Sequence, residues 1–239
     1  MKLKDLFEAT GKSVADLGIE YKGGNFNCYR KELTSLQGAP SHVDRDFYCS
    51  NNLLTSLEGA PSYVGIEFNC ARNRLTSLAG APSHVGVHFY CSDNELTSLA
   101  GAPSHVGGHF DCSNNELASL EGAPSHVSGN FYCSVNELTS LEGAPSRVGG
   151  HFYCSDNELT SFKDVHKYIA EIQGDFFGTE NPIRSHVLGL LLIKGLQWVQ
   201  LDNKQVEEIL NRHLGKGRAG MLMAQEELIE AGLEEFAQL

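Results

Sequence analysis

"HFYCSDNELTSLAGAPSHVGG" (88–108) is followed directly by "HFDCSNNELASLEGAPSHVSG" (109–129), and outward from these two segments the same phrase recurs every 21 residues. The seven cysteines mark the period, because they fall at 28, 49, 70, 91, 112, 133 and 154, and a phenylalanine lies two residues before each. A fixed period of this length is typical of proteins in which every repeat forms one unit stacked on the next. The sequence therefore predicts a solenoid.

The repeat consensus, F-x-C-x-x-N-x-L-T-S-L-x-G-A-P-S-x-V-x-x-x, separates inward from outward positions. Phe and Cys are two residues apart and share one face of a strand, and the Leu pair and the Val supply further inward positions. We expect one short strand per coil, stacked into a parallel sheet, because no single repeat buries its apolar side alone. The Asn after the strand is expected to bond backbone groups of its own coil and of adjacent coils.

The cysteine column is predicted to be structural. In stacked coils the equivalent thiols all point inward in one direction, and free Cys is among the most buried residue types. The odd number and uniform spacing do not suggest a disulfide framework. We therefore expect free thiols and a reducing, cytoplasmic location.

Three regions are expected along the chain. Residues 1–24 form an N-terminal cap, with Leu3, Leu6, Phe7, Val14 and Leu17 as a helical seal. Residues 25–183 form the solenoid of seven regular coils and a degenerate eighth, "DFFGTENPI" (175–183). Residues 184–239 form an α-helical C-terminal cap, because the apolar period becomes helical from 185 onward. Asp202 is the expected N-cap of the helix in "DNKQVEEILNRHL" (202–214).

The motif N-x-L-x-x-L, preceded by alternating apolar positions and followed by Pro, resembles a leucine-rich repeat of the short bacterial class. "NELTSL" is similar to repeats of secreted bacterial effectors, and "CSxNELTSLEGAPSxVGGxF" is closer to leucine-rich-repeat-like proteins of bacteriophages. The resemblance covers about residues 25–183 and implies a β-solenoid of leucine-rich-repeat type. It departs in having Phe and Cys at leucine positions and one extra residue between Val and Phe. The ubiquitin-ligase activity of some effectors is not implied, because no cysteine follows Cys154.

Composition excludes several classes of function. The formal net charge of −12 argues against a nucleic-acid binder, whose surface would be basic. No apolar run approaches the roughly 18 residues of a membrane span, and the N-terminus has no apolar signal core, so neither membrane insertion nor export is expected.

No catalytic set is found. His109, Asp111 and Ser113 share one side of the expected strand, but Asp lies between His and Ser, whereas a triad needs His in the middle. We therefore expect no enzyme activity and no cofactor. The cluster of His88, His109 and Asp111 leaves a metal site open, because imidazole and carboxylate suit zinc or similar ions.

The columns around Phe and Cys that point away from the core are predicted to form the binding surface, on the concave side of the sheet. Residue types vary there, whereas in the core columns they hardly change, and Tyr provides rigid contact area at low entropic cost. The candidate partner-binding residues are Tyr48, Arg72, His88, Tyr90, Asp93, His109, Asp111, Tyr132, His151, Tyr153 and Asp156. The far-side column of His42, Tyr63, His84, His105, His126 and Arg147 is assigned no role.

The leading hypothesis is a non-catalytic recognition module that binds a protein partner. The phage resemblance implies a bacterial partner, such as a host defence or metabolic protein that the module modulates or inhibits. One alternative is a protein that binds or sequesters a small ligand, such as a nucleotide, at the junction of the last coil and the helical cap, near His151, Tyr153 and Asp156. Another is an acidic mimic of nucleic acid. The sequence predicts neither the partner's identity nor the oligomeric state.

Overall fold

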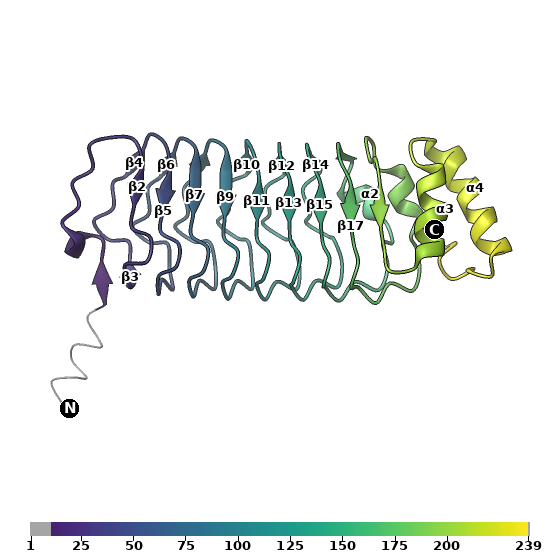
Figure 1. The fold of residues 1–239 in the computed structure, drawn as a ribbon, viewed down its shortest axis with the longest axis horizontal. Helices are drawn as coiled ribbons and strands as arrows, with labels where there is room; N and C mark the ends of the chain where they lie inside the picture. The colour runs from purple at the N-terminus through teal and green to yellow at the C-terminus, as the bar shows by residue number, and fades with distance from the viewer. Residues whose placement is uncertain (1–10, 239) are drawn as a thin grey trace, which may run out of the picture.

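Each 21-residue period forms one coil, and the coils stack along a single axis (Figure 1). The computed structural model describes residues 11–238. The largest of its parallel sheets, the first sheet, has nine strands in sequence order and carries the Phe–Cys segments. Its strands are β2 (Phe26–Asn27), β5 (Phe47–Tyr48), β7 (Glu67–Asn69), β9 (His88–Tyr90), β11 (Phe110–Asp111), β13 (Phe131–Tyr132), β15 (Phe152–Tyr153), β17 (Phe176–Phe177) and β18 (Val199–Gln200). This arrangement confirms the predicted solenoid.

A second strand in each of the seven regular coils adds to the single strand that the sequence predicted. Seven such strands form the second sheet, again in sequence order and parallel. They are β4 (His42–Val43), β6 (Tyr63–Val64), β8 (His84–Val85), β10 (His105–Val106), β12 (His126–Val127), β14 (Arg147–Val148) and β16 (Glu171–Ile172). In both sheets equivalent residues are paired, such as Phe110 with Phe131 and Val106 with Val127, so each column of the repeat becomes a straight ladder.

The coils form a nearly straight row in the view of Figure 1. We expected a concave sheet, which is the geometry of a curved row of coils. That curvature stays a prediction, and we call the outer side of the first sheet the first-sheet face.

The core consists of the repeated apolar columns. The Phe, Cys, Leu and Val columns are buried, and adjacent Phe rings have centroids between 5.2 and 5.7 Å apart. All seven cysteines are free and buried, which confirms their inward orientation. Burial raises the pKa of the Cys28 thiol to about 12 and that of Cys112 well above its ordinary value, so these thiols are kept protonated and unreactive.

A ladder of asparagines joins each coil to the one before it. The side-chain oxygen of Asn115 accepts the Leu96 N–H at 3.1 Å. Its amide nitrogen donates to the carbonyls of Cys91 and Cys112 at 3.2 and 3.0 Å. The same bonds recur from Asn52 to Asn181 and confirm the predicted role, since a bend leaves these backbone groups without strand partners.

At the N-terminal end, β1 (Lys12–Ser13) pairs in parallel with β3 (Leu33–Ser35), and the short 3-10 helix η1 (Ala15–Leu17) follows. Val14 is buried against the first coil. The helical seal that we expected over Leu3, Leu6 and Phe7 lies outside the described residues.

The C-terminal region differs from the prediction in two respects. The helices α2 (Val165–Tyr168) and η2 (Leu188–Leu192) precede β18, and α3 (Lys204–His213) and α4 (Gly217–Glu230) follow it. The first sheet thus continues beyond residue 183, and the segment after η2 is extended where we expected helix. The N-cap of α3 is Asn203, whose side chain accepts the Val206 N–H, and not Asp202.

Helix α3 covers the last edge of the first sheet. Asn211 accepts the Val199 N–H and donates to the Val199 carbonyl, both at 2.8 Å. Glu207 accepts the Leu201 N–H at 2.8 Å. These side chains provide the bonds that a further strand would make, so the ladder ends without unpaired backbone groups. Among the described helices, none is long and apolar enough to cross a membrane.

Candidate functional site

The first-sheet face is built from the residues that alternate with Phe and Cys. The column before Phe consists of Asn25, Asp46, Glu67, His88, His109, Asn130, His151, Asp175 and Trp198. The column between Phe and Cys consists of Asn27, Tyr48, Asn69, Tyr90, Asp111, Tyr132, Tyr153, Phe177 and Gln200. Strand alternation places both columns outward because Phe and Cys point inward.

The histidines of this face are bound into the backbone. His88 Nδ1 accepts the N–H of His109 at 3.1 Å, and His109 Nδ1 accepts the N–H of Asn130 at 2.8 Å. Asn130 continues the series by accepting the His151 N–H at 2.9 Å, and His151 Nδ1 accepts the Asp175 N–H at 2.9 Å. Each ring must be neutral at Nδ1 to accept, so the proton of the neutral ring is on Nε2.

Burial lowers the pKa of both His88 and His109, since it disfavours the charged imidazolium. The charge of Asp46 opposes this effect at His88, whereas the neighbouring His88 adds to it at His109. Both imidazoles are therefore held in the neutral form that their hydrogen bonds require.

Aromatic rings form a stack toward the C-terminal half of the face. Tyr132 and Tyr153 are stacked with centroids 4.7 Å apart, and Tyr153 and Phe177 with centroids 4.5 Å apart. His151 approaches the edge of this stack, with its centroid 6.0 Å from that of Phe177. The result is a half-buried aromatic surface whose rings are fixed by their neighbours.

Carboxylates gather in the N-terminal half. Burial raises the pKa of Asp111, against the lowering effect of hydrogen bonds from Ser113. Burial also raises the pKa of Tyr48 to about 12, and the charges of Glu67 and Asp46 add to this shift. Tyrosine and carboxylate side chains thus lie next to each other, and the tyrosine hydroxyls stay protonated at neutral pH.

A third outward column follows each strand at the bend. Every member has a left-handed backbone, with φ between 52° and 57° from Arg30 to Asp156. Asn and Asp tolerate this conformation well, whereas a β-branched residue does not. Val135, with φ of 57°, is the β-branched member and is 43% exposed.

A hollow of about 340 Å³ opens on the first-sheet face around Arg72. It is lined by Ser50, Asn51, Asn69, Ala71, Arg72, Tyr90, Ser92 and Asp93. Arg72 Nε lies 3.6 Å from Asp93 Oδ2, and Asn114 donates to Asp93 Oδ1 at 2.6 Å. Ala71 replaces the Ser or Tyr of the other regular coils at this position. The side chain at the base of the hollow, that of Ala71, is therefore small, and the side chains around it are mostly polar.

The structure places all the candidate residues in these outward columns, but not in one cluster. Arg72, Tyr90 and Asp93 meet at the hollow, whereas Tyr132, His151 and Tyr153 belong to the aromatic stack. The remaining candidates, Tyr48, His88, His109, Asp111 and Asp156, lie along the same columns.

Sequence reasoning missed four members of these two columns, namely Asp175, Phe177, Trp198 and Gln200. They extend the columns through β17 and β18, where the Phe–Cys signature is lost. The signal available for Phe177 was its place next to Phe176 in "DFFG" (175–178).

The hydrogen bonds of His88, His109 and Asp111 compete with metal binding at this cluster. The Nδ1 atoms of both histidines are used by backbone N–H groups, and Asp111 Oδ1 accepts the Ser113 N–H at 2.9 Å. Within residues 11–238, no three His, Cys, Asp or Glu side chains are grouped as metal ligands.

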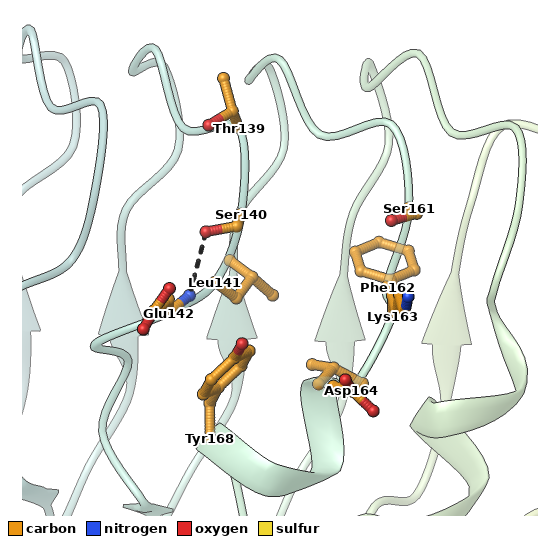
Figure 2. A pocket seen from close by; sticks show the side chains of 10 residues that line it. Thr139, Ser140, Leu141, Glu142, Ser161, Phe162, Lys163, Asp164 and Tyr168 are labelled. Carbon is orange, nitrogen blue, oxygen red and sulfur yellow. Dashed lines mark hydrogen bonds between the residues drawn. The ribbon is translucent and has the colours of Figure 1, made fainter. Parts of the chain in front are cut away.

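Of the hollows near the junction of the solenoid and the C-terminal region, two bear on a small-ligand site. One, of about 190 Å³, lies beside α2 and is drawn in Figure 2 with Tyr168 and Asp164 at its edge. The other, of about 490 Å³, is an open hollow beside Trp198, Glu208, Asn211 and Arg212. Neither is lined by His151, Tyr153 or Asp156, which we had associated with a junction pocket.

The stacked coils, the parallel ladders and the Leu–Asn pattern define a leucine-rich-repeat-like protein. Among solved structures, YopM from Yersinia enterocolitica WA-314 is similar, with a TM-score of 0.53 and 19% sequence identity. The match covers 74% of this chain and 41% of that one, so this chain corresponds to about two fifths of YopM. This similarity supports the fold. No protein-family model and no curated protein sequence matches the chain.

Proposed function

We propose that this protein is a non-catalytic recognition module that binds a protein partner along the first-sheet face. The observation that carries the proposal is the continuity of the face: the hollow at Arg72 and the aromatic stack of Tyr132, Tyr153 and Phe177 lie on the same sheet. A leucine-rich-repeat-like scaffold typically serves as a binding surface.

The aromatic stack suits protein recognition. Binding costs side-chain entropy, and these rings are already held by stacking at 4.7 and 4.5 Å, so less ordering remains to be lost. Tyr is enriched at interface positions where truncation costs the most binding energy. The polar hollow at Arg72 complements it as a place where a side chain of the partner is fixed in orientation.

The resemblance to bacteriophage repeat proteins supports a finer proposal. The partner is a bacterial protein, met in the cytoplasm of the host, whose defence or metabolic activity the module modulates. Free, buried cysteines agree with a reducing compartment.

A small-ligand function is not proposed as a second candidate. The hollow beside α2 places Lys163 next to Asp164 and Glu142 among its lining residues, so carboxylates oppose the binding of an anionic nucleotide (Figure 2).

The proposal is tested by replacing Tyr90, Tyr132 and Tyr153 together with Ala. We expect capture of a protein partner from bacterial lysate to be lost, since truncating interface aromatics costs about 2 kcal/mol or more each. The matched control is Tyr63→Ala, which removes an exposed tyrosine of the second sheet and should leave capture unchanged. Capture that persists in the triple variant, with thermal unfolding unchanged, would show that the partner binds elsewhere.

A further inference from the structure

The second sheet carries its own column of aromatic and basic side chains, which we call the outer histidine column. It consists of His42, Tyr63, His84, His105, His126 and Arg147. Their neighbours in each strand are the buried valines, so alternation turns the column outward.

Adjacent members of this column are in register. His105 and His126 are paired residues of β10 and β12, with ring centroids 5.0 Å apart and planes inclined by 24°. His84 is the preceding member, because β8 pairs with β10 through Val85 and Val106. His84, His105 and His126 therefore follow one another along the sheet with His105 in the middle, and the ring of His84 is stacked on Tyr63, with centroids 4.7 Å apart.

The imidazole nitrogens of these three residues are not used by the fold. Across residues 11–238, His84, His105 and His126 take part in no side-chain hydrogen bond, whereas the rings of His88 and His109 accept backbone N–H groups. The serines beside the column bond elsewhere: Ser83 and Ser125 donate to the carbonyls of the preceding coils at 3.1 and 3.2 Å. The lone pairs of the three rings are thus available to a ligand.

Gly86 and Gly107 place no side chain beside the outer histidine column. A Cβ atom on Gly86 would lie 2.0 Å from the Gly65 carbonyl oxygen, and one on Gly107 would lie 2.1 Å from that of Gly86. The close approach of adjacent coils therefore requires glycine two residues after His84 and two after His105.

We propose that His84, His105 and His126 form a binding site for a divalent transition-metal ion of the zinc, nickel or copper type. Imidazole is a preferred ligand of these ions. Metal–nitrogen bonds of about 2.0–2.1 Å require two nitrogens about 3 Å apart, which exposed rings on neighbouring strands reach by small rotations about their side-chain bonds. Each ion takes two adjacent imidazoles, and water completes its coordination. Within residues 11–238 no group of three such ligands is preformed, so each ion has two protein ligands.

The residues at the two ends of the outer histidine column are less suited to bind a metal ion than the three histidines in its middle. His42 Nε2 lies 3.4 Å from Asp44, and its neighbour in the column is Tyr63, so it has no imidazole partner. Arg147 follows His126, and Glu171 lies 3.8 Å from its guanidinium. His105 is shared by both possible pairs and is the essential ligand.

The test uses the full chain without an affinity tag. Titration calorimetry with Zn²⁺ and retention on immobilised Ni²⁺ measure binding in the native protein and its variants. We expect His105→Ala to reduce affinity by at least the roughly tenfold that loss of even an outer-shell partner of a metal causes. His84→Ala leaves the stacked pair of His105 and His126 and should reduce affinity by no more than about twofold, the statistical factor for losing one of two pairs. His126→Ala removes the ring stacked on His105 and should reduce affinity more than His84→Ala does.

Two further variants make the test specific. His42→Ala is the matched control and should bind metal as the native chain does. Tyr63→His joins His42 to the column and should increase both retention on Ni²⁺ and the number of Zn²⁺ ions bound. Lowering the pH should release the metal, because a protonated imidazole cannot bind it.

Two results would overturn the proposal. One is the absence of Zn²⁺ binding by the native chain at neutral pH. The other is binding of equal affinity in His105→Ala, which would assign the metal to other residues. Neither result bears on the proposed partner binding, which involves the opposite set of outward columns.

Discussion

The first and second sheets each carry a column of histidines, and the two columns are used differently. In the first sheet, His88 and His109 accept backbone N–H groups of the following coil at 3.1 and 2.8 Å. In the second sheet, His105 and His126 stack with centroids 5.0 Å apart, with His105 exposed and His126 half-buried. Residue type alone does not distinguish the columns; the backbone groups within reach of the ring do.

The difference shows how a column within one repeat can become structural. Where a backbone N–H of one coil has no partner in the sheet, an acceptor side chain of the adjacent coil can bond it. That side chain then becomes part of the hydrogen-bonded ladder. Asn130 supports this view, because it occupies the histidine column and its side-chain oxygen accepts the His151 N–H at 2.9 Å. The first-sheet column of His88, His109 and Asn130 thus requires a hydrogen-bond acceptor for the N–H of the following coil, and a histidine ring is one way to provide it.

The largest effect is expected from removing that acceptor. His109→Ala leaves the Asn130 N–H without its partner, so we expect the free energy of unfolding to fall by about 1–2 kcal/mol. His109→Asn keeps an acceptor, as Asn130 does, and should stay within about 0.5 kcal/mol of the native chain. Urea unfolding followed by circular dichroism measures both.

The second-sheet control is His105→Ala, which should change stability by less than about 0.5 kcal/mol. Equal losses for His105→Ala and His109→Ala would break the comparison between the columns.

A smaller effect, of opposite sign, is expected at the bend after β13. Val135 adopts a left-handed conformation that costs roughly 1–2 kcal/mol for a residue with a side chain on Cβ, while Asn51 and Asn114 occupy the equivalent bends. Val135→Asn should therefore raise the free energy of unfolding by about 1 kcal/mol. A fall in stability would mean that the partly buried surface of Val135 outweighs its backbone strain. The melting temperature, measured by calorimetry, decides between these outcomes.

The smallest effect concerns pH. The folded chain lowers the pKa of His88 and His109, so the unfolded chain binds more protons at these groups. Their contribution to stability is therefore full above the ordinary histidine pKa of about 6.5 and is lost as the pH falls from there through the lowered values. Both rings are partly exposed, so solvent screening keeps the loss small.

The measurement compares unfolding of the native chain and of a His88→Asn, His109→Asn double variant between about pH 8 and pH 5.5, around the ordinary histidine pKa. The native chain should lose more stability than the variant. A His84→Asn, His105→Asn variant should follow the native chain, and if it instead removed the pH dependence, the assignment of the two columns would be reversed.

The sequence predicted the coil, the core columns and the asparagine ladder, because these depend on properties that repeat with the period. Cys112 is buried and Asn115 bonds two coils for the same reason that their equivalents do. The second sheet was not predicted, since a two-residue strand such as His105–Val106 is too short to produce a recognisable alternation.

The sequence predicted the first-sheet face only as far as the Phe–Cys signature extends. In β18 the Phe position is Val199 and the Cys position is Leu201, so Trp198 was assigned to a helix. The hollow at Arg72 depends on Ala71, whose small side chain matters only once the coils are stacked. The divided use of the histidines could not be predicted either, because it depends on which backbone N–H lies beside each ring.

The bonds between Asn211 and Val199 have a consequence for assembly. A coil is the natural partner of another coil, so an open final strand would accept the first strand of a second molecule. Such a head-to-tail contact repeats without closing and produces a filament. By occupying both the N–H and the carbonyl of Val199, a single side-chain amide on α3 ends the row of coils after β18 and keeps that end of the molecule from polymerising.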